Sequence, residues 1–197
     1  MNGLPFAIKY STVIVFGTSA REALDCFFDE FRRCLGHDVE SEVSSGSAII
    51  ADEAIILMGV KSLLEDMCNT SSRLYKIYSE NYQCLQDVLN GTELLDMCGL
   101  QAAMWYQRYK DGISRGSDKS DFKCLLEATV LGCISENVTT RCGDEAGFFV
   151  VEEVHRNKFL KLASCTPQQI LQLQNSYLFS LNLESSRRRI YQRAFDL

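Results

Sequence analysis

Apolar residues recur every three to four positions through most of this chain, which is the pattern of amphipathic helices. The first stripe lies before Gly36 and consists of Leu24, Phe27, Phe28, Phe31 and Leu35. Gly36 is a natural C-terminal stop for this helix because glycine adopts the left-handed conformation easily. The segment 48–68 is apolar nearly all round through Met58, which predicts a central helix.

Further helices are predicted at 73–89, 92–109, 121–134, 143–164 and 166–182. Ser71 or Ser72 can cap the first of these, and Thr166 followed by Pro167 marks the start of the last. No alternating strand pattern persists beyond the first twenty residues. We therefore expect an all-α, disulfide-linked bundle of five to seven helices. It should form a single domain over 21–183, followed by a frayed basic tail over 184–197.

Composition places the chain among ordinary globular proteins. Hydrophobic residues are 46% of the 197 positions and charged residues 23%, with a net charge of −6. The negative charge argues against nucleic acid as a partner. No apolar run is long enough to cross a membrane.

The nine cysteines are the unusual feature of the composition. None forms a CxxC pair, and only two histidines accompany them, so we expect no metal site. Buried free thiols remain an alternative, but disulfides in an oxidising compartment explain so many cysteines better. The expected disulfide cysteines are Cys26, Cys34, Cys68, Cys84, Cys124, Cys133, Cys142 and Cys165.

Helix geometry limits how these cysteines can pair. Cys124 and Cys133 would lie ~13 Å apart on one helix and point to nearly opposite faces. A disulfide needs Cα atoms within about 7 Å, so each should pair with a different neighbour. We expect at least three disulfides between different helices. Cys98 faces the predicted core between Leu95 and Ala102, which suits an unpaired buried thiol.

Two other signals favour secretion. Three N-glycosylation triplets begin at Asn69, Asn90 and Asn137, each where a predicted helix should end. Residues 1–20 resemble a secretory leader, with an apolar run before Thr18 and Ala20. Ser19 and Glu22 could instead form a capping box in the mature chain.

No catalytic motif is present, and we expect neither enzymatic activity nor a cofactor. His37 follows a helix C-terminus, and His155 stands beside Glu152 and Glu153 on a face predicted to be solvated. Neither position indicates the base of a thiol nucleophile. Trp105, Tyr106 and Tyr109 are candidates for an exposed contact, although packing in the core is the more common role of such residues.

One stretch resembles a known group of proteins. It runs from Cys124-Leu125-Leu126 through Cys133 to Arg141-Cys142-Gly143-Asp144-Glu145-Ala146-Gly147-Phe148-Phe149. A Cys-containing helix followed by a Cys-Gly-acidic-acidic-Ala helix start resembles the cysteine-rich, all-helical secreted proteins of invertebrates. These are the insect 27 kDa haemolymph glycoprotein group and similar nematode secreted domains. The resemblance covers about 60–165 and implies an extracellular helical glycoprotein without known chemistry.

The sequence thus predicts a secreted, disulfide-stabilised glycoprotein that binds an extracellular protein or an apolar small ligand. A secreted lipid-acting hydrolase without a recognisable motif is the alternative. A cytosolic helical scaffold with reduced thiols is a third class.

Overall fold

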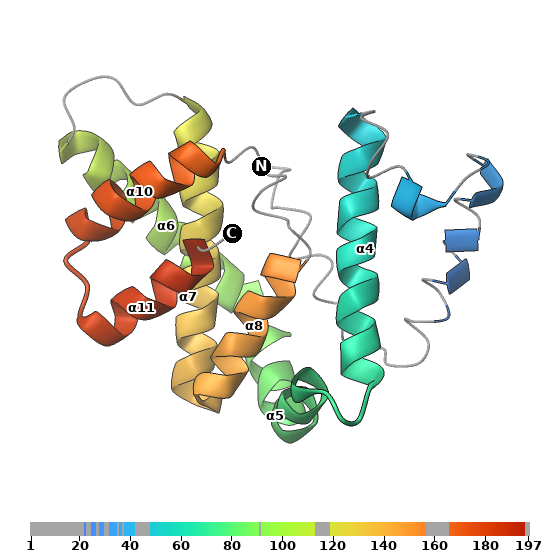
Figure 1. Cartoon of the computed structure of the whole chain (residues 1–197). Coiled ribbons are helices and arrows are strands. Elements are labelled where there is room, and N and C mark those ends of the chain that lie inside the picture. Colours follow the sequence, from blue (N-terminus) through green and yellow to red (C-terminus); the bar gives the residue numbers. More distant parts are fainter. Residues whose placement is uncertain are drawn as a thin grey trace. The chain divides into compact units, whose positions relative to one another are not determined.

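The computed structural model (Figure 1) describes parts of 22–41, and then 48–90, 92–112, 119–156 and 166–195. All regular elements within these residues are helices, which confirms the all-α prediction. The principal helices are α4 (Ala48–Cys68), α5 (Arg73–Leu89), α6 (Thr92–Gly112), α7 (Lys119–Cys142), α8 (Asp144–Arg156), α10 (Pro167–Ser180) and α11 (Ser185–Phe195). The predicted leader, 1–20, lies outside the described residues.

The chain divides into two compact units, where the sequence predicted one domain over 21–183. One unit comprises Met1–Ser79 with Arg156–Phe159, and the other Glu80–His155 with Leu160–Leu197. No proline-rich or glycine-rich linker marks the division, because it falls inside the continuous helix α5.

In the first unit, the helical segment before α4 ends where the sequence predicted. Gly36 has a φ of +79°, and its N–H donates to the carbonyl of Arg32 at 2.8 Å. Phe28, Val39 and Ala54 form a buried cluster that joins this segment to α4. The interior of the unit is therefore built by residues on both sides of the glycine stop.

The junction between α4 and α5 is fixed by polar groups. Ser72 caps α5 through its Oγ, which accepts from the N–H of Tyr75 at 3.0 Å, as one of the two predicted caps. Arg156 Nη1 lies 2.6 Å from Asp66 Oδ2 near the end of α4. Local sequence signals thus identified this helix start correctly.

The second unit is organised around α7, with α6 and α11 packed against it (Figure 1). Side chains of α7 from Cys124 to Ser135 are buried on almost every side, including the polar Glu127 and Thr129. Gly132 allows close approach of α11, because a Cβ there would lie 2.3 Å from Cδ1 of Tyr191. The most enclosed helix of this unit is therefore α7.

The end of α7 corrects the predicted helix boundary. The helix continues past Ile134 to Cys142 because Val138 is fully buried and extends the apolar side. It stops at Gly143, which has a φ of +94° and donates its N–H to the carbonyl of Thr139 at 2.9 Å. The predicted helix over 143–164 corresponds to α8 as far as Arg156, and the rest lies outside the described residues.

The predicted frayed tail over 184–197 is also corrected. Residues Ser185–Phe195 form α11, which packs on α7 and α10. Tyr191 and Ala194 are fully buried on its inner side. The arginine run suggested a solvated tail, but the apolar residues that follow it attach this helix to the unit.

Candidate functional site

Two disulfides fasten α7 to its neighbours. Cys98 of α6 bonds to Cys133 in the middle of α7, with Cα atoms 5.6 Å apart. Cys84 of α5 bonds to Cys142 at the end of α7, with Cα atoms 5.8 Å apart. Both bonds join different helices, as predicted, and both lie within the second unit.

The prediction that Cys98 is a free thiol is wrong. Its side chain is fully buried, as expected of a core-facing residue, but it faces Cys133, whose side chain points back from α7. Three predicted disulfide cysteines are free and exposed instead, namely Cys26, Cys34 and Cys68. Their side chains point to solvent rather than toward a packed helix, so burial was a misleading guide to which thiols pair.

Cys124 is also disulfide-bonded, and Cys133 pairs with Cys98, so the two cysteines have separate partners as the helix geometry required. Cys165 lies outside the described residues.

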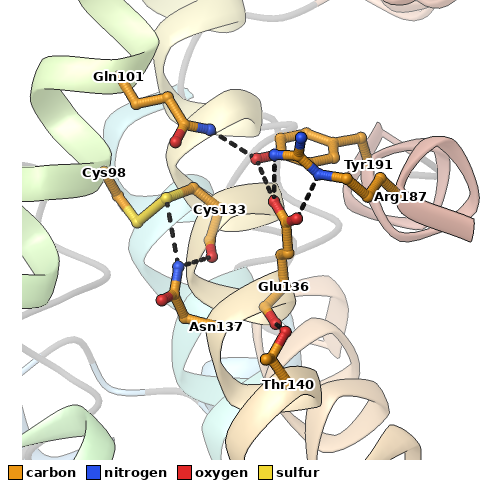
Figure 2. A network of polar contacts seen from close by, with 8 residues as sticks. All are labelled: Cys98, Gln101, Cys133, Glu136, Asn137, Thr140, Arg187 and Tyr191. Atoms are coloured by element: carbon orange, nitrogen blue, oxygen red, sulfur yellow. Dashed lines mark hydrogen bonds and ion pairs between the residues drawn. A yellow bond between two sulfur atoms is a disulfide. The ribbon is translucent and has the colours of Figure 1, made fainter. Parts of the chain in front are cut away.

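A polar network lies beside the Cys98–Cys133 bond (Figure 2). The amide of Gln101 on α6 donates to the hydroxyl of Tyr191 at 2.8 Å. That hydroxyl donates to Glu136 Oε2 of α7 at 3.1 Å. Arg187 of α11 completes the network with two bonds to the same carboxylate, one of them from Nη2 to Oε2 at 3.0 Å. The network thus joins three helices, because Glu136 of α7 binds α11 directly and Tyr191 of α11 binds Gln101 of α6.

Burial and charge in this network shift two proton affinities. The pKa of the Tyr191 phenol is raised, mainly by burial and further by the Glu136 carboxylate beside it. The pKa of the Arg187 guanidinium is raised chiefly by its hydrogen bond to Glu136. Both groups therefore keep their protons near neutral pH, and the network contains the ion pair between Arg187 and Glu136. Its role is to attach α11 to α7.

Two of the three aromatic residues predicted as contacts, Trp105 and Tyr109, are used in packing. Trp105 lies against Tyr191, with ring centroids 5.2 Å apart. Tyr109 meets Tyr177 edge to face, also at 5.2 Å, and its hydroxyl lies 2.8 Å from Ser176 Oγ. Burial raises the pKa of Tyr177 to about 12. The side of α6 that carries Trp105 and Tyr109 therefore attaches it to α10 and α11.

The other side of α6 carries an exposed apolar stripe, which we call the outer face: Met97, Leu100 and Met104. These side chains are 46%, 63% and 48% exposed, respectively. They follow one another at spacings of three and four residues, so they lie on one side of the helix. Glu93 and Arg108 flank the stripe toward its two ends, and both are exposed. Sequence reasoning missed this stripe because Leu94, Leu95, Cys98 and Ala102 offered an equally regular pattern on the same helix.

No family model, curated protein or solved structure matches this chain. The resemblance to invertebrate secreted proteins therefore stays a prediction from the sequence.

The three glycosylation triplets differ in their surroundings. Asn69 and Asn90 are exposed and follow the ends of α4 and α5, as predicted. Asn137 instead lies inside α7, where its Nδ2 donates to the carbonyl of Cys133 at 2.9 Å. The nitrogen that would carry a glycan is therefore engaged within a helix. Only the first two triplets have the exposed helix-end position that a bulky glycan requires.

Of the acidic pair before His155, Glu153 is not solvated as predicted, whereas Glu152 is partly exposed. Glu153 is 6% exposed, and burial raises its pKa to about 8, while His155 is half-buried. His37 lies outside the described residues. Within the described part of the chain, no group of three or more His, Cys, Asp or Glu could hold a metal ion. None of the described helices is long and apolar enough to span a membrane.

Proposed function

We propose that this protein is a secreted, disulfide-stabilised helical glycoprotein that acts by binding another protein, without catalysis. The outer face of α6 is the observation that carries the binding part of the proposal. It presents three exposed apolar side chains on a helix whose opposite side is bonded covalently to α7. Exposed apolar residues grouped on one surface are typical of interaction sites.

A rigid helix suits such a role. The Cys98–Cys133 bond and the Gln101–Tyr191 hydrogen bond hold α6 in place from its inner side. A partner that docks on the outer face therefore meets side chains whose backbone is already ordered, which reduces the entropy cost of binding. Because these residues lie on the outside of a helix, the face is better suited to contact with another protein surface than to enclosing a small apolar ligand.

The disulfides support the extracellular part of the proposal. Disulfides between helices persist in oxidising compartments and are rare in the cytosol. The exposed triplets at Asn69 and Asn90 suit glycosylation in the same compartment.

The test of secretion is peptide mapping without reductant, on protein collected from its native source. We expect Cys84–Cys142 and Cys98–Cys133 as linked peptides. We also expect Cys124 linked to Cys165, the one cysteine that the two bonds and the three free thiols leave over.

The same sample tests processing and glycosylation. Its N-terminus should begin at or near Arg21, and glycosidase should lower its mass through sugars on Asn69 or Asn90 but not Asn137. Fully reduced cysteines together with an intact N-terminus and no sugar would place the protein in the cytosol instead and refute the proposal.

A further inference from the structure

We propose that the partner of the α6 outer face is the same face of a second copy of this chain, packed antiparallel to the first. This inference deepens the proposed function by naming the partner, and it rests on that function in taking the outer face as a contact surface. It is carried by the spacing of the apolar stripe and by the charges at its two ends.

The stripe has the spacing of a two-helix seam. Glu93, Met97, Leu100, Met104 and Gln107 follow one another at intervals of four, three, four and three residues. Such alternation keeps one line of side chains facing a neighbouring helix over several turns. The apolar residues occupy the middle of this line, and polar residues occupy its ends, so the helix is suited to a short contact.

The two methionines of the stripe and the two flanking charges are evenly spaced about one point. Met97 and Met104 are equally far from the point between Leu100 and Gln101, and so are Glu93 and Arg108. A twofold axis at that point brings Met97 of one copy against Met104 of the other, with the two Leu100 side chains adjacent at the centre. The same axis places Glu93 of each copy near Arg108 of the other.

Charge selects the antiparallel arrangement over the parallel one. The exposed charges in the first turns of α6 are acidic, Glu93 and Asp96. Arg108 and Lys110 lie near the other end, with Asp111 beside them and bonded to Gln107. Antiparallel packing sets the acidic end of each helix against the Arg108 end of the other, whereas parallel packing sets Glu93 against Glu93. Like charges in contact oppose association.

The size of the face limits the strength of the contact. A helix of 21 residues is ~32 Å long and ~10 Å wide, so α6 alone offers an area on the order of 300 Å² per copy. Stable interfaces bury about 800 Å² per partner. We therefore expect a weak, concentration-dependent dimer with a dissociation constant on the order of 100 µM.

The experiment is sedimentation equilibrium of the full chain with its disulfides intact, at concentrations on either side of that constant. The average mass should rise with concentration from 22.3 kDa toward twice that value. Leu100→Lys should weaken association at least about tenfold, because it would bury a charge at the centre of the contact. Leu171→Lys is the matched control: Leu171 is 59% exposed on α10, outside the proposed contact, and its replacement should leave association unchanged.

Charge exchange tests the orientation. Glu93→Lys alone should weaken the dimer, because each new lysine would face Arg108 of the other copy. Adding Arg108→Glu should restore association to within about threefold of the original, since each pair becomes opposite in sign again. In a parallel dimer the single exchange would leave like charges opposite one another as before, and the second would restore nothing.

A mass of 22.3 kDa at all concentrations overturns the inference, as does a dimer that Leu100→Lys leaves intact. Neither result bears on secretion, which peptide mapping decides separately. Conversely, reduced cysteines in native protein would refute the proposed function even if the purified oxidised protein dimerises.

Discussion

Removing the Cys98–Cys133 bond tests how far covalent closure stabilises the second unit. This bond closes a loop of 35 residues that lies inside the 58-residue loop of Cys84–Cys142. Either bond, taken alone, should raise the free energy of unfolding by about 4 kcal/mol, because closing its loop lowers the entropy of the unfolded chain. The inner loop lies within the outer one. Once the inner bond has formed, the outer bond therefore closes only 23 further residues, the difference between the two sequence separations.

Considered apart from the bond of Cys124, closing both loops then contributes about 7 kcal/mol, rather than the sum of two independent bonds. Deleting the inner bond while the outer one remains should lower the free energy of unfolding by about 3 kcal/mol. Deleting the outer bond alone should lower it by a similar amount, about 3.5 kcal/mol. For a protein of this length, a loss of about 3 kcal/mol lowers the melting temperature by about 6–12 °C.

The assay compares Cys98→Ala/Cys133→Ala with Cys84→Ala/Cys142→Ala by urea denaturation, with unfolding followed through fluorescence. Trp105 is the single tryptophan and lies in the second unit against α11, so the signal reports on this unit. A loss below about 1 kcal/mol in both variants would refute the loop-entropy reasoning. The buried Cys98–Cys133 pair also loses packing, so a much larger loss there than at the half-buried Cys84–Cys142 pair would show that packing dominates.

Three further predictions use single substitutions. Gly147→Ala should destabilise the protein by about 1–3 kcal/mol in urea denaturation, because its Cβ would lie 1.8 Å from Thr139 Oγ1; Gly99→Ala has open space around it and should cost nothing. Burial raises the folded-state pKa of Glu153 from 4.5 to about 8, so stability should fall as pH rises between those values; an unchanged pH slope in Glu153→Gln would contradict this assignment. Tyr191→Phe should cost about 1–2 kcal/mol in the same denaturation assay, because its hydroxyl has partners on both α6 and α7.

Helices whose ends carry local signals could be predicted from the sequence. Gly36 stops the first segment, Ser72 caps α5, and α10 begins at Pro167 directly after Thr166. Each of these signals acts within a few residues of itself. A single sequence therefore contains the information needed to place them.

Features that depend on contacts between distant residues could not be predicted. Cys98 was correctly placed in the core, but its partner Cys133 is 35 residues away and meets it only through the packing of α6 on α7. The run from Arg187 to Arg189 suggested a solvated tail. The partner of Arg187 is Glu136 on another helix, which the local pattern could not reveal. The local pattern placed Cys98 in the core correctly but misread the arginine run as a tail, and in both cases only the tertiary fold shows what the residues contact.

The contact made by the outer face of α6 likewise cannot be deduced from the local pattern of this helix. This helix has two apolar sides, and a helix can pack only one of them against a single neighbouring layer. The side bearing Cys98 and Trp105 is used within the chain, since it holds a disulfide and a ring contact. The side bearing Leu100 is exposed, and the described part of the chain supplies no surface that buries it. The antiparallel second copy supplies a surface with the same symmetry as the stripe itself.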